Sequence, residues 1–248
     1  MDREPYDMSA TEPPDRDGVL NLYKPTWQSS ARYVYRLRPI LGIRKIGHAG
    51  TLDPFADGVV LACVGRATRL FDRLTGLPKQ YRTTLRLGVT NETFDTERPF
   101  EAVPGAQPPP RDLVEQAVAG FVGEIGQAPP AFSAVRIRGM SSYHYARRGQ
   151  AIQHDARPVH IYRMEILAYD WPALRLDIGC GRGTYIRAIA RDLGAKLGCG
   201  ACCETLTRLA VGPFHIDKSV NLDTTLPGEV AARLLPLADV QRLLEATP

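Results

Sequence analysis

The chain has 248 residues, of which 44% are hydrophobic and 23% charged, and its formal net charge is +4. This composition is ordinary for a globular protein with one large core or two modest ones, and it excludes disordered and fibrous classes. The longest apolar run, residues 59–64, is far too short to cross a membrane, and the acidic first residues do not resemble an export signal. Five cysteines, an odd number, do not fit a secreted disulfide framework, so we expect reduced thiols and a cytoplasmic protein.

Charge is unevenly distributed along the chain. The first 17 residues hold six acidic residues and two arginines, a net charge of −4, which leaves +8 on residues 18–248. Because this segment also holds three prolines and few apolar residues, we expect residues 1–17 to form a flexible acidic tail. The basic excess elsewhere is compatible with a polyanionic partner and supports one only weakly by itself.

In chain order, the pattern first predicts a strand over residues 18–23 and a helix that begins at a Ser29 or Ser30 cap and ends near residue 37. A buried strand follows over residues 59–64, with a short helix from residue 67. Residues 81–87 alternate in polarity, which predicts a half-buried strand with a basic outer face.

The second half of the chain continues with a proline-rich loop over residues 99–110 and a helix over residues 113–121. A strand over residues 174–180 precedes a helix over residues 186–197, and the last 30 residues are expected to pack as a tail. Because hairpins and irregular loops outnumber strand-helix-strand units, we expect an α+β fold with a mixed, largely antiparallel sheet flanked by helices and loops.

Residues 128–158 form an irregular region in which arginines and aromatic residues are interleaved. They are Arg136, Arg138, Arg147, Arg148 and Arg157, with Tyr143, His144 and Tyr145. Arginines beside aromatic rings are typical of loops that grip RNA, and a solvated surface helix explains Arg147 and Arg148 equally well.

Residues 47–54, with the sequence GHAGTLDP, isolate one carboxylate in a restricted backbone. The glycines permit a tight turn, and Pro54 disfavours helical geometry at Asp53. An aspartate before proline is ordinarily a turn residue that bonds its own backbone. The neighbouring His48 and the basic surroundings favour a functional carboxylate instead, so Asp53 is our candidate catalytic residue.

Two other motifs suggest different chemistry. The glycine-rich turn over residues 179–183 follows a strand and precedes a helix, as in methyltransferases that bind S-adenosylmethionine. Such a fold needs further strand-helix units, and the 65 residues after Gly183 do not supply them. Cys199 and Cys202 form one C-x-x-C pair, but a structural zinc site needs a second ligand pair, so we expect buried thiols and no metal.

Six groups of short segments follow one another in order between residues 18 and 211. They are GVLNLYKP (18–25), GHAGTLDP with ADGV (47–54, 56–59), GRATR (65–69), KQY (79–81), GTYIR (183–187), and GCGA with LTRL (198–201, 206–209). Together they resemble the TruB family of tRNA pseudouridine synthases. The segments PPAFSA (129–134), YAR (145–147) and ARP (156–158) resemble its bacterial branch, in which this region is an insertion that wraps the RNA.

The resemblance implies the pseudouridine synthase fold and an isomerase that acts on uridine 55 in the T-arm stem-loop of tRNA. The uracil is detached from its sugar, turned and rejoined through carbon, so no cofactor, membrane or obligate protein partner is expected. Asp53 would be either the nucleophile on the sugar or the base that removes a sugar proton. Arg187 would hold Asp53 towards the sugar, Tyr81 would stack on the extruded uracil, and Tyr185 and Leu206 would line its pocket.

The resemblance also gives roles to residues around this pocket. His48 would lie under the flipped nucleotide or touch its phosphate, and Lys24 would support the catalytic loop and reach the RNA backbone. The catalytic domain would span residues 18–248, without the small C-terminal RNA-binding domain usual in the family, and Cys202 stands where relatives often have histidine. A non-catalytic RNA-binding module is the alternative, and replacing Asp53 with asparagine distinguishes the two.

Overall fold

A ten-stranded sheet runs through the whole protein in the computed structural model, which describes residues 16–133, 135–137, 140–146, 148–150, 152 and 154–246. Its path is β14-β1-β3-β12-β4-β11-β10-β7, with β2 paired to β3 and β13 to β12. The strands are β1 (Gly18–Lys24), β2 (Ile46–Ala49), β3 (Asp57–Val64), β4 (Lys79–Leu87), β7 (Gly123–Gln127), β10 (Arg157–Asp170), β11 (Ala173–Cys180), β12 (Ala201–Val211), β13 (Phe214–His215) and β14 (Leu235–Pro236). Two small ribbons pair β5 (Val89–Thr90) with β6 (Glu101–Ala102) and β8 (Arg136–Ile137) with β9 (Met140–Ser141).

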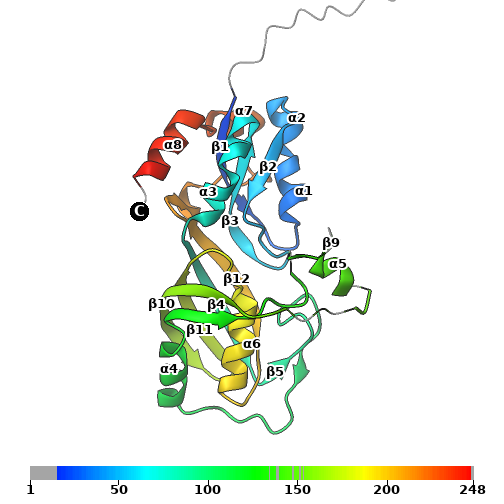
Figure 1. Ribbon diagram of the computed structural model, residues 1–248, viewed down its shortest axis with the longest axis vertical. Helices are drawn as coiled ribbons and strands as arrows, with labels where there is room; N and C mark the ends of the chain where they lie inside the picture. Colours follow the sequence, from blue (N-terminus) through cyan, green and yellow to red (C-terminus); the bar gives the residue numbers. More distant parts are fainter. Residues whose placement is uncertain are drawn as a thin grey trace, which may run out of the picture.

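Helices flank this sheet along its length (Figure 1). They are α1 (Ser30–Tyr35), α2 (Leu37–Leu41), α3 (Phe71–Gly76), α4 (Arg111–Ala119), α5 (Ser142–Ala146), α6 (Ile186–Lys196), α7 (Pro227–Ala232) and α8 (Leu237–Glu245), with 3₁₀ turns at η1 (Gly65–Leu70) and η2 (Ile216–Lys218). No helix within the described ranges is long and apolar enough to cross a membrane.

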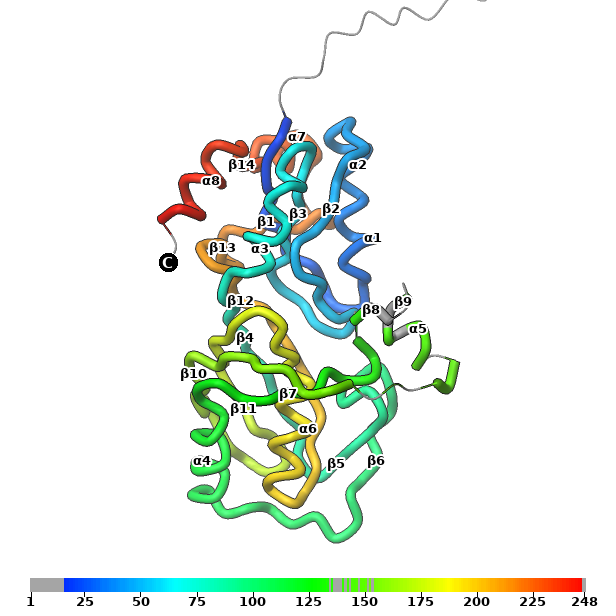
Figure 2. Tube along the Cα trace, in the orientation of Figure 1, coloured from blue at the N-terminus to red at the C-terminus, as the bar shows by residue number. Residues whose placement is uncertain are grey.

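One seam divides the sheet into two halves. All neighbouring strands on its path pair antiparallel except β3 and β12, which run parallel and meet only through Asp57–Gly58 and Thr207–Arg208. Gly58 has φ +107°, and a Cβ there would lie 2.3 Å from the carbonyl oxygen of Arg208. Only glycine allows the two strands to approach this closely. Figure 2 shows β1–β3 with α1–α3 above the seam, and β4, β10 and β11 with α4 and α6 below it.

Apolar packing joins the two halves on one face of the sheet. A cluster of buried side chains runs from α1 and β1 through β4 and β11 to α6, and a second cluster lies between β3, α3 and α8 and includes Val211 and Phe214 from the ends of β12 and β13. In α6, Ile186, Ile189, Ala190 and Leu193 are all buried, as the spacing of this helix predicts. Because both halves share this core, the loops at the seam are anchored to two elements whose relative position is fixed.

The fold class is confirmed, and so are the strands predicted over residues 18–23, 59–64, 81–87 and 174–180. The helix predicted from Ser29 is capped there but breaks at Arg36 into α1 and α2. The C-terminal residues do more than pack as a tail, because β14 adds an edge strand beside β1 and α8 buries Val240 and Leu244. Strands β10 and β12 are missing from the sequence prediction, since their polarity does not alternate regularly.

The boundary of the predicted acidic tail is wrong by two residues. Arg16 donates to the carbonyl of Leu41 at 2.7 Å, and the carboxylate of Asp17 binds both the backbone N–H and the guanidinium of Arg66. Asp17, which the sequence analysis assigned to the acidic tail, therefore forms an ion pair with Arg66. Residues 1–15 lie outside the described residues, as do Arg138, Arg147 and the side chains of Arg136 and Tyr143 in the predicted RNA-gripping region.

Candidate active site

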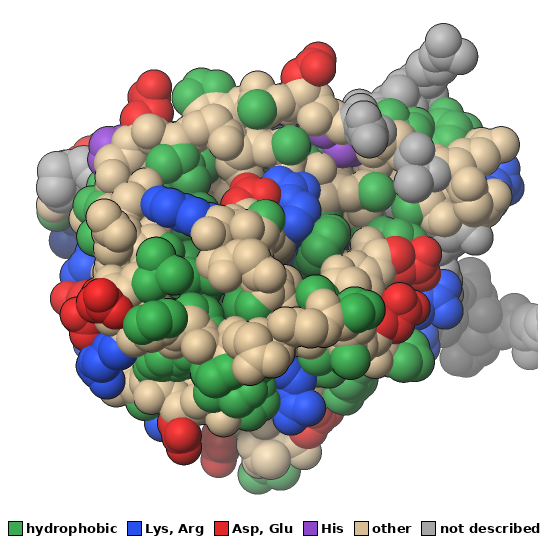
Figure 3. All heavy atoms as spheres, turned by 90° about the horizontal axis from the view of Figure 1, so that it is seen from below, with side chains coloured by type: hydrophobic (Ala, Val, Ile, Leu, Met, Phe, Trp, Pro, Cys, Tyr) green, Lys and Arg blue, Asp and Glu red, His purple; other side chains and the backbone are tan. Residues whose placement is uncertain are grey.

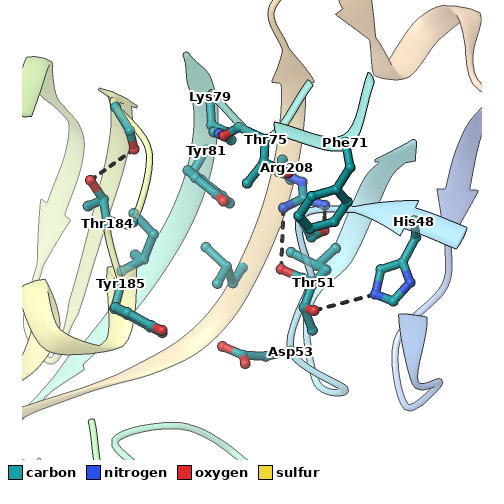
Figure 4. A pocket seen from close by; sticks show the side chains of 16 residues that line it. His48, Thr51, Asp53, Phe71, Thr75, Lys79, Tyr81, Thr184, Tyr185 and Arg208 are labelled. Atoms are coloured by element: carbon teal, nitrogen blue, oxygen red, sulfur yellow. Dashed lines mark hydrogen bonds between the residues drawn. The ribbon is translucent and has the colours of Figure 1, made fainter. Parts of the chain in front are cut away.

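A cavity of about 570 Å³ opens at the seam of the sheet. Its walls come from the loop before β3, from α3 and β4, from the turn between β11 and α6, and from β12 (Figure 4). Most of the residues that the sequence predicts for the site line it: His48, Asp53, Tyr81, Tyr185 and Leu206. Lys24 and Arg187 are not among the lining residues, and both act on the site from behind it.

The loop before β3 is fixed by side chains that hold its backbone. Arg208, which is 1% exposed, donates from Nε to the Val59 carbonyl at 2.7 Å and from Nη2 to the Gly50 carbonyl at 2.9 Å. Ser30 accepts from the N–H of Leu52 at 3.0 Å and donates to its carbonyl at 2.9 Å. Because the main chain is held on both sides of Asp53, the position of its Cα and hence the reach of its carboxylate are fixed.

Lys24 completes this support and does not reach outward. It is 0% exposed, and Nζ donates to the carbonyls of Pro25 and Gln28 at 2.9 Å, Pro54 at 3.3 Å and Ala56 at 2.6 Å. Burial lowers its pKa to about 8, although the Asp57 and Asp53 carboxylates act in the opposite direction. The predicted contact with an RNA backbone is therefore wrong for this structure, because the ammonium is enclosed by carbonyl oxygens. Its supporting role is what the geometry provides.

The carboxylate of Asp53 is bound through both of its oxygens by Arg187. Nε of Arg187 lies 2.8 Å from Oδ2, and Nη2 lies 3.1 Å from Oδ1. The same guanidinium donates to the carbonyls of Thr93 at 3.0 Å and Phe132 at 2.8 Å, and it lies 3.4 Å from Oδ2 of Asp95. A planar guanidinium with every side occupied has no freedom to turn, so it fixes the orientation of the Asp53 carboxylate.

Burial differs sharply across this three-residue network. The side chains of Arg187 and Asp95 are 3% and 1% exposed, whereas Asp53 is 30% exposed and borders the cavity. Burial works against the charge of Arg187, but the two carboxylates outweigh it and raise its pKa. Burial likewise raises the pKa of Asp95, opposed by the nearby Arg187 charge. The network thus presents one carboxylate to the cavity and keeps the other behind it.

Two tyrosines and a leucine face this carboxylate. Tyr185 precedes α6 and is clamped by Gln127, whose Oε1 accepts from its N–H at 2.7 Å and whose Nε2 donates to its carbonyl at 3.2 Å. Burial and the Asp53 charge raise the pKa of Tyr185, so its hydroxyl stays protonated. In Figure 4 Tyr185 and Asp53 point toward one another. Tyr81 of β4 and Leu206 of β12 are 8% and 5% exposed and form the inner apolar wall.

His48 lies at one side of the cavity, on β2. Its Nε2 is 3.4 Å from Oγ1 of Thr51, and burial together with the Arg208 charge lowers its pKa. The ring is therefore neutral at pH 7 and faces the cavity as a polar aromatic surface.

Sequence reasoning missed several residues that shape the site. Asp95 lies in a loop wound around Asn91, whose Nδ2 donates to the carbonyls of Asp95 and Arg98, and nothing in its spacing links it to Arg187. Arg208 and Lys79 belong to two of the segments that carry the family resemblance, and only their place in those segments could have indicated a role in the site. Ser30 was considered as a helix cap, but Ser29 is the cap and Ser30 binds the loop.

The competing motifs take other roles. The glycine-rich turn joins β11 to α6, but β11 pairs antiparallel with both neighbours, which is wrong for a nucleotide-binding parallel sheet. Gly181 and Gly183 line the cavity instead. All five cysteines are buried free thiols, and burial raises the pKa of Cys63 and Cys202 to about 12. No group of three metal-ligating side chains is present among the described residues.

Two family models match consecutive parts of the chain. The N-terminal domain of TruB family pseudouridylate synthases matches residues 38–186, and the C-terminal domain of tRNA pseudouridylate synthase B matches residues 187–229. The chain belongs to the TruB family of pseudouridylate synthases. The prediction of this family from the sequence is confirmed, and with it the enzyme class.

Curated TruB relatives cover most of the chain. A tRNA pseudouridine synthase B of Syntrophobacter fumaroxidans is 42% identical over 234 residues, which are 92% of this chain and 76% of that protein. One from Dehalococcoides mccartyi is 40% identical over 233 residues, covering 89% and 78% of the two chains. Both are bacterial, as the resemblance in residues 129–158 implies.

Solved structures show the same fold. The chain superposes with a TM-score of 0.70 and 26% identity on one from a Cbf5-Nop10-Gar1 complex, over 92% of its own length. With 28% identity and a TM-score of 0.62, it also matches one from an H/ACA RNP bound to a substrate RNA containing 2'-deoxyuridine, over 84% of its own length. It spans 62% and 52% of those two chains.

Proposed function

We propose that this protein isomerises uridine to pseudouridine in tRNA, at position 55 of the T-arm loop, with Asp53 as its catalytic residue. The observation that carries the proposal is the Asp53 carboxylate, held through both oxygens by a buried arginine at the edge of a cavity. The tRNA substrate is supported by relatives at about 40% identity that are tRNA pseudouridine synthases.

The proposed steps follow from where the side chains lie. The target uridine leaves its stack and enters the cavity, where Tyr81 supports the ring and Leu206 excludes water. Asp53 then acts at the sugar, as nucleophile on C1′ or as base on a sugar proton, while Arg187 keeps the carboxylate in place. The detached uracil turns within the pocket and C5 bonds to C1′, which on the nucleophile route breaks the bond to the Asp53 carboxylate. C5 then loses its proton and N1 gains one, so the reaction is an isomerisation and no cofactor takes part.

Recognition of one exposed loop base fits the surface of the protein. On the face shown in Figure 3, described basic and acidic side chains are interspersed with apolar ones and do not gather by sign. Loop nucleotides are already partly unstacked, so they enter a pocket at a smaller energetic cost than paired ones. The proposal therefore depends on the cavity at the seam.

The decisive experiment replaces Asp53 by its uncharged isostere. The Asp53→Asn variant, incubated with unmodified tRNA and no added cofactor, should form no pseudouridine while binding the tRNA nearly as well as wild type. Pseudouridine is mapped in the product RNA, and binding is followed by fluorescence anisotropy. Undiminished product would refute the role of Asp53. Binding without product in the wild-type protein would favour a non-catalytic RNA-binding module.

A further inference from the structure

Phe71 is an aromatic side chain exposed at the mouth of the cavity. It is 45% exposed although it begins helix α3, whose Leu74 is completely buried in the upper core. Phe71 belongs to neither cluster of buried side chains, and no ring or cation contact of it is found within the described part of the chain. It nonetheless lines the cavity, and Figure 4 places its ring on the side of His48 and Thr51, away from Tyr185.

A cation reaches the residue that follows Phe71. Arg182 is in the turn between β11 and α6, flanked by Gly181 and Gly183, which line the cavity. Its side chain is 58% exposed, and Nη2 is 3.8 Å from Oδ1 of Asp72, which is 85% exposed. So long and solvated an ion pair contributes little energy, and it leaves the guanidinium available to another partner.

We propose that Phe71 and Arg182 form a stacking site for the nucleobase next to the target uridine. This inference rests on the proposed function, because a second base reaches the opening only when the first has entered the cavity. Flipping one nucleotide removes the stacking partner of its neighbour, and an exposed phenylalanine beside a guanidinium replaces that partner. Stacking on an aromatic ring tolerates any base, so the site adds affinity for an unstacked loop without reading its sequence.

The test separates affinity from chemistry. With a T-arm stem-loop, Phe71→Ala should raise Kd and KM by roughly tenfold, the scale of one lost stacked base, and leave the single-turnover rate at saturation within about twofold. Phe71→Trp should restore affinity and Phe71→Leu should not, because stacking requires a ring. Leu113→Ala is the matched control, since Leu113 is 41% exposed on α4, which contributes nothing to the cavity wall.

A second measurement identifies the stacked base. A stem-loop with an abasic nucleotide beside the target should lose about as much affinity as Phe71→Ala does, and the combination should lose little more than either change alone. Unchanged Kd in Phe71→Ala, rescue by leucine, or additive losses at both neighbouring positions would overturn the inference. Because Kd is measured without reference to product, these outcomes stand apart from failure of the isomerase proposal, in which wild-type protein forms no pseudouridine.

Discussion

Two buried arginines serve the same cavity, and their surroundings differ. Arg187 is 3% exposed and contacts the carboxylates of Asp53 and Asp95. Arg208 is 1% exposed and donates to the carbonyls of Gly50 and Val59, and no carboxylate pairs with it among the described residues. The first charge is balanced by acids, whereas the second is met by backbone carbonyls and by the hydroxyl of Tyr81.

The two arginines therefore have different roles, which the sequence alone does not distinguish. Arg187 orients a side chain, because its planar fork matches both oxygens of Asp53. Arg208 shapes a main chain and leaves positive charge on the cavity wall, where the buried Lys79 adds to it. In the proposed reaction the detached uracil is electron-rich, and a preorganised positive wall stabilises such a species.

The largest effect is expected from Arg187→Ala. It frees the Asp53 carboxylate, so product formation should fall roughly 100-fold or more, as it does when a reacting group loses its position. It also leaves Asp95 buried beside no cation, which should lower the free energy of unfolding by about 3–5 kcal/mol. Single-turnover kinetics and urea denaturation measure the two effects.

Variants of Asp95 show whether the lost stability comes from a stranded charge. In Arg187→Ala, the raised pKa of Asp95 means that the folded state holds a proton that the unfolded state has released, so stability should fall as the pH rises. Adding Asp95→Asn should remove this pH dependence and recover part of the stability. A double variant as unstable and as pH-dependent as the single one would contradict the charge-balance explanation.

Arg208→Met is expected to have the next largest effect. Carbonyl groups of Gly50 and Val59 lose their donor, at a cost of about 1–3 kcal/mol for each buried group left unsatisfied. No carboxylate is stranded, so between pH 5 and pH 8 the loss should vary only through His48, whose pKa the Arg208 charge lowers, in contrast to Arg187→Ala. Parallel urea denaturation at both pH values tests the contrast directly. A pH dependence of this loss that persists in a His48→Gln background would mean that an acid depends on this arginine after all.

Lys79→Met should change how stability responds to alkaline pH. Burial and the Arg208 charge lower the pKa of Lys79 from 10.5 to about 8, and burial lowers that of Lys24 to about 8 as well. Between pH 8 and pH 10.5 the unfolded chain holds a proton on each lysine that the folded chain has lost, so each lysine adds stability as the pH rises, whereas the buried thiols with their raised pKa act in the opposite direction. Removing Lys79 should abolish about half of the lysine contribution, so the stability of Lys79→Met relative to wild type should fall between pH 7.5 and pH 9.5. Urea denaturation of both proteins at the two pH values would show it, and a constant difference between them would exclude the contribution of Lys79.

Local pattern determined much of the fold and only part of the site. Helix α6 and strands β1, β4 and β11 follow from periodicity, because one face of each is buried, and β3 follows from an apolar run that is buried on both faces. The loop of Asp53 follows from glycine and proline, which act on their own neighbours. The pairing of Arg187 with Asp95 does not follow, because it joins residues 92 positions apart through a loop without regular structure. The burial of Lys24 was equally hidden, since exposure is the ordinary state of a lysine.

The smallest effect concerns two adjacent serines whose roles the structure separates. Ser29 caps α1 by accepting from the N–H of Arg32 at 3.3 Å, and Ser30 binds both backbone groups of Leu52 beside the catalytic loop. Each change to alanine should cost about 1 kcal/mol in unfolding free energy, through a lost cap or lost buried hydrogen bonds. Only Ser30→Ala should also slow the single-turnover rate, by a few-fold, because only that serine holds the backbone next to Asp53. Equal rates in the two variants would show that the arginine and lysine contacts fix the loop without it.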